Sequence, residues 1–158
     1  MQLALHCYAA AKNYAYQDLN LSKDDFSISL LLADEAESQD VFCADALILF
    51  CPENFAAIAG GMKNFLDRSF YPWLRAIDEQ GSLGRGYGAQ AAKPYQIVID
   101  TGNDGSFCLQ QMQKILKGVC AKAIQEPMII LAKPGQDDLA DMQSLGQGFV
   151  EAMQQGLF

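Results

Sequence analysis

The stretch from Asp45 to Arg68, DALILFCPENFAAIAGGMKNFLDR, decides the fold of this chain. It opens with a continuous apolar run from Ala46 to Cys51, which is typical of a strand buried on both faces. A short loop follows, in which Asn54 is placed to cap a helix through its side-chain oxygen. The expected helix has an apolar stripe formed by Phe55, Ile58, Met62, Phe65 and Leu66. A strand that turns directly into a helix creates a crevice with free backbone N–H groups, where open α/β sheets bind ligands.

Four other apolar segments predict strands, and helical patterns separate several of them. The predicted strands are Leu3–Tyr8, Phe26–Leu32, Tyr95–Asp100 and Pro127–Ala132. Apolar stripes predict helices over residues 109–119 and 139–153. Because strands alternate with helices, we expect the α/β class with a doubly wound, five-stranded parallel sheet. The strand count and chain length suit the order 2-1-3-4-5 in one domain, residues 1–158.

Composition narrows the possible partners. The chain has 158 residues and a net charge of −8, which argues against binding to nucleic acid or to an anionic membrane. Five cysteines without a CxxC pair are typical of free thiols in a reducing cytoplasm, so we expect a cytoplasmic protein. The single histidine argues against a His-rich zinc site and against a Ser-His-Asp triad. We therefore expect no metal site.

The segment from Asp45 to Arg68 resembles the flavodoxin-like superfamily, in particular its NADPH-dependent FMN reductase and quinone reductase branch. The resemblance is carried by Pro52, Phe55, Lys63, Phe65, Leu66 and Asp67. It implies a non-covalently bound FMN, with NAD(P)H as the possible electron donor and a quinone, a flavin or a similar small molecule as the acceptor. It implies no particular catalytic residue, because the cofactor carries the chemistry in such proteins.

The resemblance also implies that FMN lies across three loops, which follow the first, third and fourth predicted strands. The loop after the third predicted strand would follow the edge of the flavin ring, and the loop after the fourth would close over it. The candidate cofactor-binding residues are Pro52, Glu53, Asn54, Phe55 and Ala56 in one loop, and Thr101, Gly102, Asn103, Asp104 and Gly105 in the other. The alternative for residues 52–56 is a simple strand-to-helix turn, and the alternative for residues 101–105 is a capped helix start.

The loop after the first predicted strand departs from the family pattern. FMN-binding relatives hold the phosphate there with Ser, Thr, Gly and Asn, but this chain has no Ser, Thr or Gly before Asn20. The candidate phosphate-binding residues are Ala9, Ala10, Lys12 and Asn13. The departure supports an alternative function, in which a flavodoxin fold has lost FMN and serves as a binding or assembly module.

Two segments after the predicted helix have no clear place in a flavin site. The aromatic cluster at residues 70–73 is suited either to packing under a neighbouring loop or to contacts in a homodimer or higher homo-oligomer. The Gly-rich segment at residues 75–93 is expected to form a surface excursion.

Overall fold

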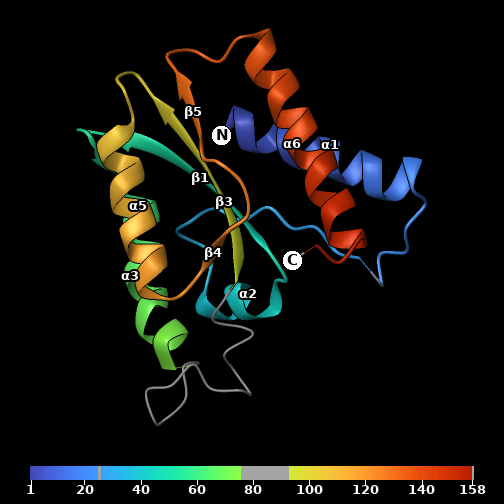
Figure 1. The fold of residues 1–158 in the computed structure, drawn as a ribbon, viewed down its shortest axis with the longest axis horizontal. Helices are drawn as coiled ribbons and strands as arrows, with labels where there is room; N and C mark the ends of the chain where they lie inside the picture. Colours follow the sequence, from blue (N-terminus) through green and yellow to red (C-terminus); the bar gives the residue numbers. More distant parts are fainter. Residues whose placement is uncertain (25, 76–92, 158) are drawn as a thin grey trace. The chain divides into compact units, whose positions relative to one another are not determined.

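The computed structural model describes residues 1–24, 26–75 and 93–157 (Figure 1). These residues form two compact units, of which one is Leu32–Ala132 and the other combines Met1–Leu31 with Lys133–Phe158. Most of the predicted Gly-rich excursion lies outside the described residues.

The first unit is built on a sheet with β3 at its centre. β3 (Pro94–Thr101) pairs in parallel with β1 (Leu47–Asn54) on one side and with β5 (Met128–Leu131) on the other. Two short strands complete the sheet: β2 (Ala57–Ile58) runs antiparallel to the end of β1, and β4 (Lys122–Ala123) runs parallel to the start of β3. The described residues of this unit also form the helices α2 (Ser38–Cys43), α3 (Gly60–Arg75) and α5 (Ser106–Gly118).

Strands predicted after Asp45 are confirmed, whereas the two predicted before it are wrong. Leu3–Tyr8 lies within helix α1 (Gln2–Asn13), and Phe26–Leu32 has no regular structure among its described residues. The doubly wound, five-stranded parallel sheet of order 2-1-3-4-5 is therefore wrong in detail. The observed sheet is mixed, with the order β2-β1-β3-β4 and with β5 paired to β3.

The helical state of the first segment has a local reason. Residues 1–19 contain no β-branched side chain and several alanines, which favour helix over strand. The buried positions Leu3, Cys7, Ala11 and Ala15 recur every four residues, so they form one face of a helix.

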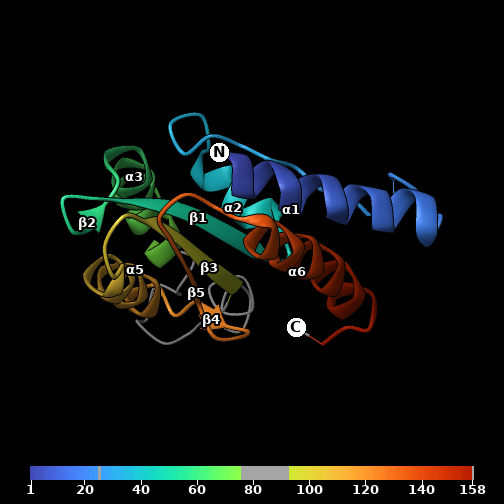
Figure 2. The same cartoon turned by 90° about the horizontal axis from the view of Figure 1, so that it is seen from above.

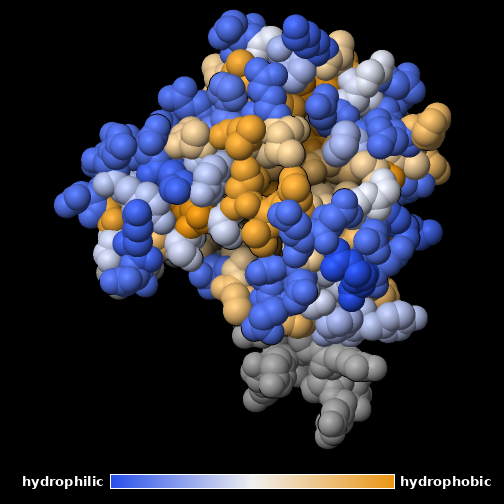
Figure 3. Space-filling view, turned by 180° about the vertical axis from the view of Figure 1, so that it is seen from behind, coloured by the Kyte–Doolittle hydropathy of each residue, from blue (hydrophilic) through white to orange (hydrophobic). Residues whose placement is uncertain are grey.

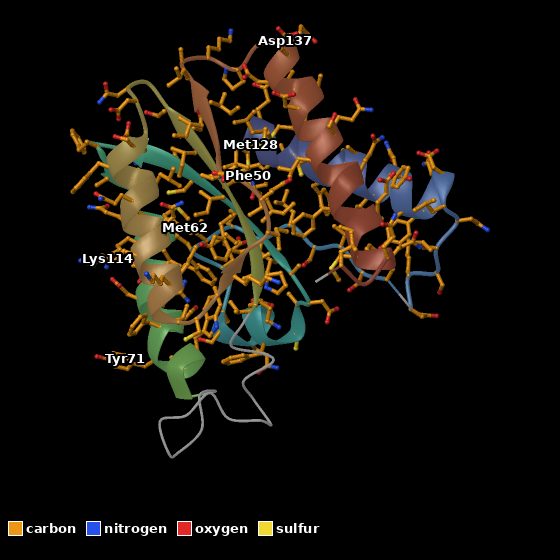
Figure 4. The ribbon with its side chains drawn as sticks, in the orientation of Figure 1. Phe50, Met62, Tyr71, Lys114, Met128 and Asp137 are labelled. Carbon is orange, nitrogen blue, oxygen red and sulfur yellow. The ribbon has the colours of Figure 1, made fainter. Side chains whose placement is uncertain are left out.

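The core of the sheet unit lies between one face of the sheet and helices α3 and α5. Alternate residues of the central strands, such as Cys51 and Ile99, point toward these helices and are fully buried. Met62 of α3 points toward the sheet, whereas Lys114 of α5 points away from it (Figure 4). The predicted stripe on α3 is confirmed at Met62, Phe65 and Leu66, which all belong to this core.

The second unit is a helical one, made of α1, a π-helical turn (Tyr14–Asp18) and α6 (Gln136–Gln154). Helices α1 and α6 lie side by side (Figure 2). They approach closely at Gly146, where an added Cβ would lie 2.4 Å from the carbonyl oxygen of Cys7. The Tyr14 hydroxyl donates a hydrogen bond of 2.5 Å to Glu151 of α6, and this bond raises the pKa of Tyr14.

Hydrophilic side chains cover much of the face seen in Figure 3, as the acidic composition leads one to expect. Within the described ranges, no helix has both the length and the apolar composition needed to cross a membrane.

Candidate functional site

Two of the three predicted cofactor loops meet at the carboxyl edge of the sheet. β1 and β3 run in parallel with Pro52 opposite Asp100, so the segments that follow them lie next to each other. Residues 52–56 and 101–105 are therefore neighbours. In open α/β sheets this edge is where ligands bind.

A hydrogen-bonded chain joins the two loops. The Thr101 hydroxyl donates a hydrogen bond to Oε2 of Glu53, and the same hydroxyl oxygen accepts the backbone N–H of Asn103 at 2.9 Å. The other carboxylate oxygen of Glu53, Oε1, is buried and has no hydrogen-bond partner among the described residues. A buried acceptor without a donor costs about 1–3 kcal/mol. The edge of the sheet thus contains one strong acceptor that is free to bind an N–H or O–H group.

The loop after β1 is a hairpin turn rather than the start of a helix. Asn54 ends β1 and pairs with Ala57 of β2, so its predicted role as a helix cap is wrong. Phe55 and Ala56 form the turn with φ values of 52° and 58°, as type I′ turns require. Non-glycine residues rarely adopt this conformation, because the left-handed backbone crowds the Cβ atom. The turn places the Phe55 side chain fully in solvent.

Helix α5 holds this hairpin in place. The Gln111 side chain accepts the backbone N–H of Ile58 at 3.3 Å, which ties β2 to α5. The sequence contains no signal that would single out Gln111 among the glutamines of this helix. Ile58 was predicted in a helical stripe but lies in β2, and its side chain is still buried in the core.

The loop after β3 forms a capped helix start. Oδ1 of Asp104 accepts the backbone N–H of Ser106 at 3.0 Å and its hydroxyl at 2.9 Å. These bonds lower the pKa of Asp104. Gly105 precedes α5 with a φ of 69°, and a Cβ added there would lie 3.0 Å from Cγ2 of Ile129. Gly102 and Asn103 complete the loop and are exposed.

Two thiols lie directly beneath this edge. The sulfur atoms of Cys51 on β1 and Cys108 on α5 are 4.0 Å apart, and both residues are buried. Burial raises the pKa of Cys108 to about 12, with further contributions from Cys51 and from the charge of Glu53. Burial also raises the pKa of Cys51. Both thiols are therefore small buried side chains that stay protonated near neutral pH.

The third predicted loop does not exist as a loop. Ala9, Ala10, Lys12 and Asn13 lie within α1, in the helical unit. In an α-helix each of their N–H groups bonds to the carbonyl oxygen four residues earlier. The Lys12 ammonium donates to the Tyr8 hydroxyl at 3.1 Å and lies 5.0 Å from the centre of its ring. A strand-to-helix turn with free N–H groups is therefore not present at these positions.

The aromatic cluster at residues 70–73 lies in α3. Trp73 is buried in the core, which leaves it unable to serve as an oligomer contact. Tyr71 is 70% exposed and points away from the helix (Figure 4). Among the described residues, no group of three or more His, Cys, Asp or Glu side chains is placed to hold a metal ion.

Comparison with known proteins gives one family. The sequence profile of NADPH-dependent FMN reductases matches residues 34–134, more than half of the chain. No curated protein matches the sequence.

Several solved structures share the fold. A flavodoxin from the domain Archaea is similar over 94% of this chain and 89% of its own, with a TM-score of 0.65 and 14% identity. Oxidised flavodoxin 1 from Bacillus cereus is similar over 95% of this chain and 88% of its own, with a TM-score of 0.63 and 14% identity. A flavodoxin, WrbA-like protein from Agrobacterium tumefaciens is similar over 96% and 90%, with a TM-score of 0.62 and 15% identity. The fold is therefore of the flavodoxin-like α/β type.

Proposed function

Because the chain belongs to the NADPH-dependent FMN reductase family, we propose that it binds FMN non-covalently at the carboxyl edge of β1 and β3. In this proposal it passes electrons from NAD(P)H to a quinone, a flavin or a similar small molecule. The bound flavin would supply the redox chemistry, and the protein would bind it, orient it and exclude competing reactions.

The observation that carries the proposal is the unpaired oxygen of Glu53. Oε1 is buried at the point where the two loops meet, and the neighbouring Oε2 is held by Thr101. A flavin ring carries an N–H group on its edge, which would give Oε1 the donor that it lacks. A hydrogen bond to a charged group contributes about 1.5–3 kcal/mol. The ring side of the site therefore fits a flavin.

The remaining loop residues would shape the site around the ring. Phe55 stands at the tip of a strained turn, and its exposed ring is available to contact a planar ligand. Gln111 holds the base of that turn through Ile58. Gly102 and Asn103 are exposed on the opposite loop, and a Cβ added at Gly102 would meet nothing within 4 Å, so a ligand can approach the backbone there. In this proposal Gln111 is a positioning residue, and Glu53 is the residue that contacts the ring.

The test is direct. The purified protein is examined for a visible flavin spectrum, and the flavin-free form is titrated with FMN while flavin fluorescence is followed. We expect saturable binding and flavin-dependent oxidation of NADH or NADPH with a quinone acceptor. A colourless protein that shows no saturable binding at micromolar FMN would refute the proposal.

A second function is favoured by helix α1. Ala9–Asn13 are helical, so these described residues do not form the phosphate-binding turn of the family, which is consistent with a protein that has lost its cofactor. Such a chain would act as a binding or assembly module. It would bind neither FMN nor riboflavin, and it would show no nicotinamide oxidation with any acceptor.

We also propose a homodimer or higher homo-oligomer. Tyr71 supports this idea, since it is a large exposed aromatic side chain on α3. Sedimentation of the Tyr71→Ala variant beside the parent protein would test it.

A further inference from the structure

The phosphate of FMN has no matching site at the positions where the family would place it. The N–H groups of Ala9, Ala10 and Asn13 are used inside α1, so they have no free hydrogen to donate. Lys12 offers one ammonium, which is already engaged with Tyr8. A dianionic phosphate needs several directed donors in a concave backbone nest, and a single lysine does not replace them.

Four helix starts in the described residues are also closed to an anion. A helix amino end attracts phosphate because its first N–H groups are free and its dipole is positive there. In this chain a carboxylate lies at each of four such ends. Asp40 and Asp138 accept backbone N–H groups at the starts of α2 and α6, Asp104 does so at α5, and Asp34 lies against Gly61 in the first turn of α3.

The flavin edge itself carries acidic side chains. Asp104 belongs to the loop beside Glu53 and Thr101, and its hydrogen bonds to Ser106 keep its pKa low, so it carries a charge near neutral pH. The whole chain has a net charge of −8. Lys133 lies two residues after the end of β5 in the sequence, but it is one exposed, hydrated point charge. A phosphate placed near this edge would be repelled more than attracted.

We infer that the site selects a flavin ring and does not select the phosphate, so that riboflavin binds at least as tightly as FMN. This inference rests on the proposed function, since it assumes that a flavin ring binds. It names the ligand class more narrowly: an uncharged flavin, or another planar ring with an N–H donor, is a full ligand of this site.

The experiment compares two ligands that differ only in the phosphate. The full chain is freed of any bound flavin and titrated with FMN and with riboflavin at ionic strengths of about 0.01 M and about 0.15 M, where the Debye length is roughly 30 Å and 8 Å. We expect the two dissociation constants to agree within about threefold at the higher ionic strength. A tenfold difference would correspond to about 1.4 kcal/mol of binding free energy, so the expected difference is smaller than that. At the lower ionic strength FMN should bind more weakly than riboflavin, because its charge is less screened.

Variants separate the possible sources of a phosphate effect. Lys12→Ala and Lys133→Ala should leave the FMN-to-riboflavin ratio unchanged, whereas Asp104→Asn should improve FMN binding at low ionic strength without improving riboflavin binding. FMN binding that is about tenfold or more tighter than riboflavin binding would overturn the inference and leave the proposed function standing. If neither flavin binds, the proposed function fails and this inference fails with it.

Discussion

Gly146 provides the sharpest test of the helical unit, because Gly148 lies two residues away in the same helix and serves as its control. A Cβ added at Gly146 would lie 2.4 Å from the Cys7 oxygen and 3.1 Å from the Ala11 nitrogen, whereas one added at Gly148 meets nothing within 4 Å. Both contacts at Gly146 are with backbone atoms of α1, which cannot rotate away. The optimal separation of such atoms is about 3.5–4.0 Å, so α1 and α6 would have to move apart by about 1 Å.

The expected change in the free energy of unfolding has opposite signs for the alanine variants at Gly146 and Gly148. Replacing glycine by alanine inside a helix gains about 1 kcal/mol from propensity, and Gly148→Ala should show most of this gain. At Gly146 the overlap costs about 1–3 kcal/mol, and the loosened contact along the two helices adds to this cost. We therefore expect Gly146→Ala to be less stable than the parent protein by about 1–2 kcal/mol after the propensity gain is subtracted.

Urea unfolding followed by far-ultraviolet circular dichroism measures the difference in stability between each variant and the parent protein. A shift of the unfolding midpoint with an unchanged dependence of the free energy on urea concentration reports stability alone. The fluorescence of Trp73, which lies in the core of the sheet unit, shows whether the effect stays within the helical unit. A Gly146→Ala variant that is as stable as Gly148→Ala would show that the two helices do not cross at this residue.

Four further predictions concern the carboxyl edge. Gly105→Ala should lower stability by about 1–3 kcal/mol in urea unfolding, because of its left-handed backbone and the nearby side chains, whereas Gly102→Ala should be close to neutral. Ala56→Gly should raise stability by about 0.5–1 kcal/mol by relieving the turn, and a loss would show that the turn is not strained. Glu53→Gln should weaken riboflavin binding about fivefold to tenfold in a fluorescence titration, since a neutral acceptor replaces a charged one, without destabilising the flavin-free protein. The pKa of Cys108 is about 12 in the folded protein against an ordinary 9.0, so the thiol loses its proton at a lower pH in the unfolded chain than in the folded protein. The free energy of unfolding should therefore be unaffected by this thiol below pH 9 and should fall as the pH rises from 9 toward 12. Cys108→Ala should reduce that fall, as urea unfolding at several pH values would show.

Much of the sheet unit could be read from Asp45–Arg68 and the strands that follow it. Continuous apolar runs at β1 and β3 were long enough to identify buried strands, and the helical stripe at Met62, Phe65 and Leu66 gave the face of α3. The departure of the first loop from the family pattern was also visible, because the absence of Ser, Thr and Gly before Asn20 is a matter of composition alone.

Tertiary structure decided what short patterns leave ambiguous. An apolar run of six residues such as Leu3–Tyr8 suits a strand or a buried helix equally, and its helical state follows from packing along every fourth residue. The start of α3 could not be located because the type I′ turn at Phe55 and Ala56 lacks the glycine and asparagine that normally mark it.

The amino-acid sequence by itself determined the class of fold, the family and the position of the candidate edge, because these depend on hydrophobic pattern and on local motifs. Only the tertiary structure decided which polar groups are paired there. The hydrogen bond from Thr101 to Oε2 of Glu53 and the thiol pair of Cys51 and Cys108 each join residues about 50 positions apart, and Oε1 of Glu53 is left unpaired beside them. Such pairings depend on distances between separate elements, and those distances exist only once β1, β3 and α5 have packed together.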